Sequence, residues 1–271
     1  MPPSVAVVTD STAYLPPVGG ITVVPLSVVA GGVSYDEPDY TGDLAAATTS
    51  QPSPDRFAAV YATLAEAGHT AVVSVHLSSA LSGTAGAAAL AGASAALPVE
   101  VVDSRSLAMG LGYPVLAAAR EAARGAGLTA VAEAARACAA ATRTFFCVDT
   151  LDQLRRSGRV SATASIFGSA LMIKPLLHIS GGTIQPLEKV RTAARAVARM
   201  EDLAVEAAGS APVDVAVQHV GASERAQVLA ERLKGRLPAV RELRVVEVGA
   251  VVGAHVGPGM VGITVAPGGY G

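Results

Sequence analysis

The sequence predicts an α/β fold in which a parallel sheet is built from strand–helix–strand units. Short apolar segments are followed by segments with the length and end signals of helices, and this alternation recurs along the 271 residues. Strands that alternate with helices in this way favour βαβ units, whose strands are parallel. At roughly 100–200 residues per domain, the length suits one large domain or two smaller ones.

The N-terminal half shows this alternation most clearly. Val5–Thr9 is a continuous apolar run, which is typical of a strand buried on both faces. Ser53 and Pro54 suit the N-cap and the first position of a helix, so we expect a helix over Asp55–Ala67. The other elements expected here are a hairpin of Ile21–Val29 and Val33–Tyr35, strands at Thr70–Val75, Val99–Val102 and Thr144–Val148, and helices after Gly83, near Ser106–Arg124 and over Leu128–Arg143.

The second half of the chain differs in pattern, and we place a domain boundary near residues 148–160. The chain is therefore divided into an N-terminal α/β domain, residues 1–155, and a C-terminal α/β domain, residues 156–271. The elements expected in this half are a polar helix at Asp149–Arg159, a small-residue apolar segment at Ile166–Leu171, a basic helix at Leu187–Met200, a helix at Glu224–Leu237, and strands at Leu176–Ile179, Val213–Gln218, Leu243–Val248 and Val261–Val265.

The composition excludes several classes of protein. Charged residues make up 15% of the chain, against about 25% in an average soluble domain, and the mean hydropathy is +0.45. Low charge with high hydropathy is the opposite of a disordered chain. With 20 Lys and Arg against 22 Asp and Glu, the formal net charge of −2 provides no basic surface for nucleic acid. We therefore expect a globular protein that does not bind nucleic acid.

Neither secretion nor a membrane span is expected. The N-terminal residues carry no basic segment ahead of their apolar run, as a secretory signal would. Residues 71–99 lack Lys, Arg, Asp and Glu, but they contain His76, Pro98 and many hydroxyl side chains, which make a poor membrane span. Cys138 and Cys147 cannot form a disulfide framework, and their spacing fits no zinc site. The sequence thus predicts a cytoplasmic protein.

The sequence offers no convincing cofactor or metal motif. Gly257–Gly262 satisfies the G-x-G-x-x-G pattern of dinucleotide-binding proteins, but that pattern should follow a strand and open a helix. Here it leads into the strand expected at Val261–Val265, so we reject it as a dinucleotide site. No two of the five histidines have the spacing of metal ligands. We expect no cofactor and no metal.

Three polar segments stand at the ends of expected strands or the starts of helices. The first, Thr48–Ser53, can cap the helix that follows it, or its hydroxyls can bind an anion. The second, Ser78–Thr84, is a strand-to-helix turn whose amides and hydroxyls either cap the helix or bind an anion at its positive end. The third, Gly253–Gly259, holds His255 among three glycines and a proline in an expected loop. Such a backbone permits close approach by a ligand or another chain.

Basic side chains gather at two places in the second half of the chain. Arg155, Arg156 and Arg159 either lie on a solvated helix face or form a surface that contacts a partner protein or an anionic membrane. Arg195 and Arg199 stand four residues apart in an expected helix, and a solvated face is the simpler interpretation there.

Eight short segments, spread over nearly the whole chain, carry a family resemblance. They are Val8–Thr12, Thr49–Pro52, Ser78–Thr84, Val101–Ser104, Leu154–Arg159, Ile173–Leu177, Lys189–Thr192 and His255–Gly259. In these segments the chain resembles the DegV family. Eight matches in the same order are far more specific than any single one of them.

The resemblance implies a fold and a function. The fold would have a three-layer N-terminal domain with a parallel sheet and an α/β C-terminal domain with a mixed sheet, with a long-chain fatty acid buried between them. Family members act as fatty-acid-binding subunits for a separate fatty acid kinase, a dihydroxyacetone-kinase-like protein, which phosphorylates the carboxylate to an acyl phosphate. The chain would then be a carrier and not itself an enzyme. Transient contact with an anionic membrane would let it collect its lipid.

The resemblance also implies the groups that hold the fatty acid carboxylate. Carried over to this sequence, they are the hydroxyls of Thr49, Ser50, Ser78 and Ser79, the imidazole of His255 and, near the head group, Arg191. Two departures from the family pattern, Ala80 and Ala85, leave these donors in place and bear on the width of the tunnel mouth.

Two other functions compete with the carrier. One is a serine hydrolase, with one of the Ser residues as nucleophile, Ser79 being the one to test, His255 as base and Asp10 or Asp103 as the group that orients the base. No nucleophile-elbow sequence supports it. The other is a lipid-responsive regulatory module that has no kinase partner.

Overall fold

Two sheets and a small antiparallel sheet make up the fold. The computed structural model describes residues 4–16, 18–160 and 174–269. The parallel sheet has the order β2-β1-β6-β7, with β1 at Val5–Asp10, β2 at Ile21–Val24, β6 at Ala71–His76 and β7 at Val99–Asp103. The small sheet has the order β4-β3-β5, with β3 at Ser27–Ala30, β4 at Val33–Asp36 and β5 at Thr48–Ser50.

The second large sheet is mixed. It has the order β10-β9-β8-β13-β11-β12, in which β11 and β12 are parallel and the other neighbours are antiparallel. Its strands are β8 at Arg143–Cys147, β9 at Lys174–Ser180, β10 at Thr183–Val190, β11 at Val213–His219, β12 at Val240–Glu247 and β13 at Val261–Pro267. The sequence therefore predicted the fold class correctly, with one parallel and one mixed sheet.

Helices cover both faces of the parallel sheet. On one face, Ala6 and Val8 of β1 pack with Phe57 of helix α1 (Pro54–Glu66) and with helix α2 (Thr84–Gly92). On the other, Val5 and Val7 pack with helices α3 (Met109–Ala123) and α4 (Leu128–Ala141). Because successive strand side chains point to opposite faces, a run that is apolar at every position suits a sheet covered on both sides.

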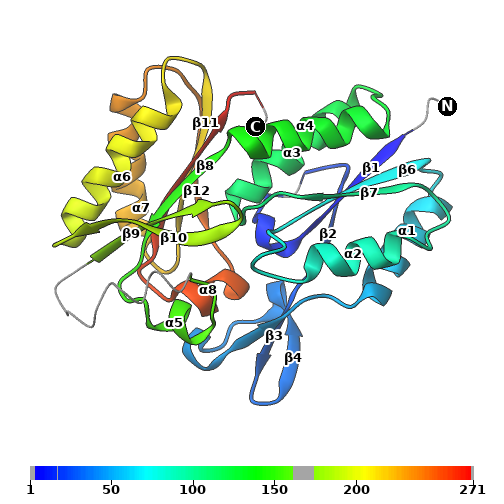
Figure 1. The fold of residues 1–271 in the computed structure, drawn as a ribbon, viewed down its shortest axis with the longest axis horizontal. Coiled ribbons are helices and arrows are strands. Elements are labelled where there is room, and N and C mark those ends of the chain that lie inside the picture. Colours follow the sequence, from blue (N-terminus) through cyan, green and yellow to red (C-terminus); the bar gives the residue numbers. More distant parts are fainter. Residues whose placement is uncertain (1–3, 17, 161–173, 270–271) are drawn as a thin grey trace.

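Helices α3 and α4 also pack against the mixed sheet, so they lie between the two large sheets (Figure 1). Leu111 and Val115 of α3 belong to the core of the parallel sheet, whereas Met109 and Tyr113 pack with Ala216 of β11. A helix that is buried all round has to be apolar all round. The first ten residues of α3 are all buried, and none of them carries a charge.

The outer face of the mixed sheet is covered by α6 (Ala193–Ala208) and α7 (Ser223–Arg236). Two short helices, α5 (Asp152–Arg156) and α8 (Ala250–Val256), pack together next to the small sheet (Figure 1). Within residues 4–16, 18–160 and 174–269, no helix combines the length and apolarity needed to cross a bilayer.

Several predicted boundaries were wrong, and each has a local reason. Ile21–Val29 is two strands in different sheets, separated at Pro25, which has no N–H to donate to a ladder. The expected helix Leu187–Met200 begins only at Ala193, because Thr192 caps it and the preceding residues continue β10. The polar helix Asp149–Arg159 is shorter and spans only α5, whereas Ile166–Leu171 lies outside the described residues.

The expected loop around His255 was also wrong in part, because its first half is the helix α8. The rejection of a dinucleotide site is consistent with the structure, since the glycine-rich turn leads directly into β13. The domain limits 1–155 and 156–271 stay a prediction. Strand β8, which precedes residue 155, pairs with β13 and β9 in the mixed sheet.

A fully buried polar network connects β1 to β6. The carboxylate of Asp10 accepts hydrogen bonds from His76 Nδ1 at 3.0 Å and from the Leu77 amide at 3.0 Å. His76 Nε2 lies 2.7 Å from Ser74 Oγ, which accepts a hydrogen bond from Tyr61 at 2.9 Å. This Ser–His–Asp order resembles a catalytic triad, but all three side chains have no exposed surface. The network therefore stabilises the sheet.

We predict that Asp10→Ala destabilises the protein strongly, because it leaves a buried histidine and a backbone amide without their acceptor. The expected loss in free energy of unfolding is about 3–5 kcal/mol, measured by urea denaturation. Asp39→Ala, which removes an exposed carboxylate, is the control and should change stability by less than about 0.5 kcal/mol. Equal effects of the two substitutions would contradict a stabilising role for the network.

Candidate functional site

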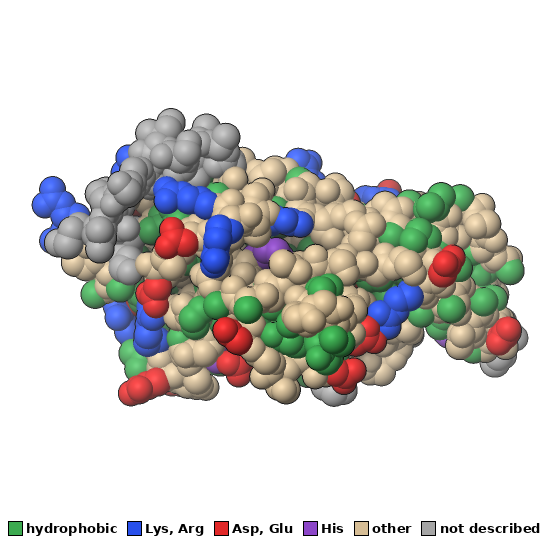
Figure 2. All heavy atoms as spheres, turned by 90° about the horizontal axis from the view of Figure 1, so that it is seen from below, with side chains coloured by type: hydrophobic (Ala, Val, Ile, Leu, Met, Phe, Trp, Pro, Cys, Tyr) green, Lys and Arg blue, Asp and Glu red, His purple; other side chains and the backbone are tan. Residues whose placement is uncertain are grey.

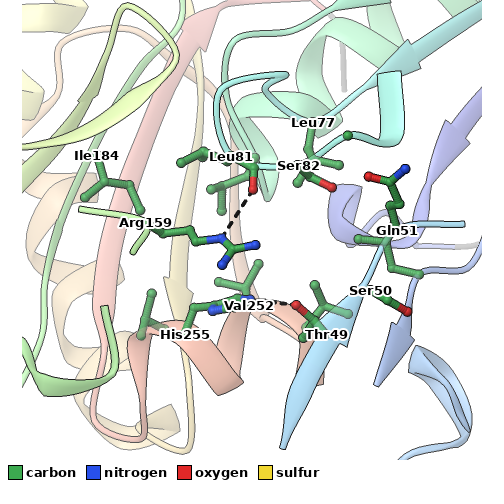
Figure 3. Close-up of a pocket in the computed structure, with 15 residues that line it drawn as sticks. Thr49, Ser50, Gln51, Leu77, Leu81, Ser82, Arg159, Ile184, Val252 and His255 are labelled. Carbon is green, nitrogen blue, oxygen red and sulfur yellow. Dashed lines mark hydrogen bonds between the residues drawn. The ribbon is translucent and has the colours of Figure 1, made fainter. Parts of the chain in front are cut away.

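A cavity of about 290 Å³ lies where the small sheet, the end of the parallel sheet, α8 and β10 meet (Figure 3). Its walls are mostly apolar, with a group of polar side chains on one side. The lining residues are Leu26, Thr49, Ser50, Gln51, Leu77, Leu81, Ser82, Gly83, Leu107, Arg159, Ile184, Val251, Val252, His255 and Val256. Arg159 is the only charged side chain among the described residues of this lining.

Thr49 and His255 meet at the cavity although 206 residues separate them in the chain. Thr49 lies on β5 opposite Val28 of β3, and His255 lies in the last turn of α8. Thr49 Oγ1 and His255 Nε2 are 2.7 Å apart. Side chains alternate along a strand, and in Figure 3 the Ser50 hydroxyl accordingly points away from His255. Thr49 is therefore the better placed of the two predicted hydroxyls.

The hydrogen bond to Thr49 can run in either direction, and the direction decides what the site offers a ligand. If Nε2 carries the imidazole proton, His255 donates to Thr49 Oγ1, and the Thr49 hydroxyl proton is free for an acceptor in the cavity. His255 Nδ1 is buried and has no hydrogen-bond partner among the described residues. Burial, with a smaller effect of the Arg159 charge, lowers the pKa of His255 to about 4, so its imidazole is neutral at pH 7.

Arg159 supplies the positive charge of the cavity. It follows α5, and its Nε donates to the Leu81 carbonyl oxygen at 3.4 Å, while Nη1 donates to the Ser157 carbonyl. These contacts direct the guanidinium between the Ser-rich turn and α8 (Figure 3). The sequence had suggested Arg159 for an outer surface together with Arg155 and Arg156. Of the three, the structure places only Arg159 in the lining, and the other two are exposed.

The turn after β6 contributes Ser82 rather than Ser78 or Ser79. The Ser82 and Thr84 hydroxyls are 2.8 Å apart, so Ser82 keeps its proton for a ligand when Thr84 is the donor. Neither the sequence pattern nor the family resemblance had identified Ser82 as a ligand, although it lies in the matching segment Ser78–Thr84. Gln51, also missed, packs on Gly83, where an added Cβ would lie 1.9 Å from Gln51 Oε1. Gly83 in the Ser-rich turn was the sequence signal that another residue approaches the backbone closely at this point.

Three predicted ligands are placed elsewhere by the structure. Ser78 is buried and donates to the Gly182 carbonyl at 2.6 Å, and exposed Ser79 donates to Asp103 at 2.5 Å. Arg191 is exposed, seven residues beyond Ile184, at the end of β10. At about 3.3 Å per strand residue, its backbone lies roughly 20 Å along β10 from Ile184, the residue of that strand that lines the cavity. We therefore leave these three side chains out of the site.

A buried carboxylate holds α8 in place. Glu37 accepts hydrogen bonds from the Val251 amide at 2.7 Å, from the Tyr14 hydroxyl at 2.8 Å and from the Ser11 hydroxyl. Tyr14 in turn accepts from the Val252 amide at 3.2 Å. Burial raises the pKa of Glu37, and the hydrogen bonds from Ser11 and Tyr14 oppose that change. This cluster joins the end of β1, the small sheet and α8, and so it sets the position of His255.

A smaller inner pocket of about 30 Å³ adjoins the cavity. The two spaces share Leu107, Ile184, Val252 and Val256. The remaining lining of the inner pocket is Ala108, Thr144, Phe146, Ile179, Gln218, Met260 and Gly262. Together, the two spaces have polar and positively charged side chains at one end and mostly apolar walls elsewhere, with Thr144 and Gln218 in the lining of the inner pocket.

The residues of the hydrolase hypothesis do not form one site. Ser79 bonds to Asp103, Asp10 bonds to His76, and His255 bonds to Thr49. No cluster of three or more His, Cys, Asp or Glu side chains able to hold a metal ion occurs in the part of the chain that the structure describes.

An α/β protein in which two sheets and an inserted small sheet enclose such a space is suited to bind an amphiphile with an anionic head and an apolar tail. Comparison with known proteins gives the family. The model of the DegV family, described as one of uncharacterised proteins, matches residues 4–268. The chain belongs to the DegV family.

Similar proteins share both sequence and fold with this chain. A DegV domain-containing protein of Streptomyces coelicolor is 50% identical over an alignment of 275 positions, which covers 97% of this chain and 98% of that protein. A Thermus thermophilus DegV family protein, described by its fatty acid binding, superposes with a TM-score of 0.89 at 30% identity, covering 97% of this chain and 99% of that one. Bacillus subtilis DegV, described as a fatty acid binding protein, has a TM-score of 0.87 at 33% identity, with the same coverage.

We predict that His255 makes stability depend on pH. Its pKa is about 4 in the folded protein and about 6.5 when unfolded, so the unfolded state binds the extra proton between these values. The free energy of unfolding should therefore fall by about 2 kcal/mol between pH 7 and pH 5 through this group alone. His255→Gln should remove that part of the loss in urea denaturation at the two pH values. Parallel losses in variant and wild type would show that His255 is not desolvated.

Proposed function

We propose that this protein binds a long-chain fatty acid in the cavity, with the carboxylate near Thr49, Ser82, His255 and Arg159 and the acyl chain along the apolar walls. The observation that carries the proposal is the position of the Arg159 cation beside hydroxyl donors at one end of an apolar space. A carboxylate taken out of water needs hydrogen bonds or a counter-charge. The described fatty acid binding of similar proteins supports the same ligand.

The energetics of such a ligand divide between tail and head. At about 0.8 kcal/mol per buried CH₂, a chain of about sixteen carbons contributes on the order of 10 kcal/mol before the losses of binding. The head group adds charge-assisted hydrogen bonds, which are stronger than neutral ones. Because Arg159 and a neutral imidazole line the cavity, it favours an anionic head over a neutral one. The tail therefore supplies most of the affinity, and the head fixes the orientation.

We predict that Arg159→Gln weakens the binding of palmitate by about 10- to 100-fold, because a charge-assisted hydrogen bond contributes about 1.5–3 kcal/mol. Arg159→Lys, which keeps the charge, should lose less. Arg191→Gln is the matched control and should bind as wild type does, since Arg191 is exposed and outside the lining. The measurement is calorimetric titration of delipidated protein.

Two results would contradict this proposal. If delipidated wild-type protein bound no fatty acid, the function itself would be refuted. If Arg191→Gln weakened binding and Arg159→Gln did not, Arg191 and not Arg159 would be the arginine near the head group.

The second part of the proposal concerns the fate of the bound fatty acid. We infer that the protein presents the bound carboxylate to a separate fatty acid kinase, which forms the acyl phosphate, and that Arg155 and Arg156 belong to the docking surface. Both are exposed on α5, and Arg159 follows three residues later and lines the cavity. The face that carries α5 and α8 shows Lys and Arg side chains around a histidine in a hollow (Figure 2). A partner that reacts with the carboxylate has to approach that face.

We predict that the double variant Arg155→Glu and Arg156→Glu binds palmitate as wild type does but lowers kinase-dependent acyl-phosphate formation by at least about tenfold, because charge reversal opposes a complementary partner. Arg195→Glu on α6 is the matched control. Unchanged turnover would refute docking at α5. Loss of flotation with anionic liposomes, without loss of turnover, would assign the surface to a membrane.

Three measurements distinguish the competing functions from the carrier. A regulatory module would bind palmitate but would neither co-purify with a dihydroxyacetone-kinase-like protein nor support acyl-phosphate formation. A serine hydrolase would react with a fluorophosphonate probe, and Ser79→Ala would abolish the reaction. The bond from Ser79 to Asp103, away from His255, favours the carrier over the hydrolase.

A further inference from the structure

The inner pocket ends at two side chains that face a second space. Thr144 of β8 and Ile179 of β9 line the inner pocket, and they also line an open groove on its far side. We call this space the arginine groove, because Arg105, Arg136, Arg143 and His178 line it together with backbone of the β9–β10 turn. Thr144 and Ile179 are therefore the partition between an apolar pocket and a charged, open surface.

Hydrogen bonds hold this partition in one conformation. Thr144 Oγ1 lies 3.0 Å from Thr264 Oγ1, to which Gln218 Nε2 donates at 2.8 Å. Gln218 Oε1 accepts from the Met109 amide at 2.7 Å, and the side chains of Thr144, Gln218 and Thr264 are buried. Helix α3 also packs closely against Thr144, because a Cβ added to Gly110 would lie 2.9 Å from the Thr144 Oγ1. The Thr144 side chain thus has little freedom to turn aside.

We propose that Thr144 and Ile179 are the end wall of the acyl site and set the longest fatty acid that this protein binds well. The inference rests on the proposed fatty acid binding, since it assigns the far end of the same cavity. A chain that fits adds affinity with each methylene that it buries, by about fourfold per methylene. A longer chain must either buckle or displace the wall and enter the arginine groove. There its methylenes meet water and charged groups, and the gain stops.

The polar groups beside the end wall further disfavour fatty acids that are too long. The hydroxyl of Thr144 and the amide of Gln218 are already bonded within the Thr144–Thr264–Gln218 network. A methyl end that pushed between them would leave buried polar groups without partners, which is unfavourable. The specificity is therefore for chain length, with the acyl end stopping before the network.

The experiment compares a series of saturated fatty acids of about 12 to 22 carbons on delipidated wild type, Thr144→Ala and Ile179→Ala. In wild type, affinity should rise with chain length to a maximum and then fall. Both alanine variants remove side-chain volume from the wall, and the acyl end can fill the vacated space. The maximum should therefore move to chains at least about two carbons longer, with the best longer acid gaining about tenfold or more over wild type. Ile179→Phe, which thickens the wall, should move the maximum to shorter chains.

Thr144→Val is the matched control. It keeps the shape of the wall and removes only the hydroxyl, so the maximum should stay at the wild-type length even if the variant is less stable. Mass spectrometry of the lipids retained by each purified variant provides a second readout, in which longer acids should accompany the two alanine variants.

The outcomes separate the two proposals. Wild type that binds no fatty acid would refute the proposed function. Wild type that binds with a clear maximum, together with alanine and phenylalanine variants that keep the same maximum, would overturn the end wall alone. A maximum that moves in Thr144→Val as far as in Thr144→Ala would also overturn it, because hydrogen bonding and not shape would then set the length.

Discussion

The structure depends on one packing constraint, the burial of helices α3 and α4 between two sheets. Each helix is packed on both sides, and α3 contributes to the cores of both the parallel and the mixed sheet. Close-packed interiors resist relative movement, so this helix pair fixes the distance and angle between the sheets. Thr49 and His255 come from opposite ends of the chain, and their 2.7 Å contact exists because the two halves are held in this way.

The same arrangement explains the chemistry of the cavity. Where the halves meet, His255 is largely shielded from water, and burial keeps its imidazole neutral at pH 7. Arg159 retains its charge. Glu37 fixes the helix that carries His255 by accepting a hydrogen bond from the Val251 amide, and its carboxylate also accepts from the Tyr14 and Ser11 hydroxyls. A cation beside hydroxyl and imidazole groups in a partly buried cavity favours an anionic group there, because electrostatic interactions are stronger in a low dielectric.

Sequence reasoning predicted the alternating elements of the first half well, because continuous apolar runs and helix caps are local signals. It failed where the deciding contact was distant. Ile21–Val29 has the composition of one strand, yet Pro25 and the partner strands divide it between two sheets. Arg159 and Arg191 both lie in segments that match the family, so the sequence did not distinguish them. Arg159 lines the cavity because it follows α5, whereas β10 carries Arg191 away from the cavity.

By itself, the sequence determined the fold class, the family and the segments from which the site is built. Those properties follow from local periodicity and from short motifs, which are features of the sequence whether or not the chain is folded. The tertiary structure decided which side chains face one another: Thr49 rather than Ser50 lies toward His255, Ser82 rather than Ser79 lines the cavity, and Thr144 lines the inner pocket. Side-chain direction depends on strand register and on packing across the sheets, and both are set by residues far apart in the chain.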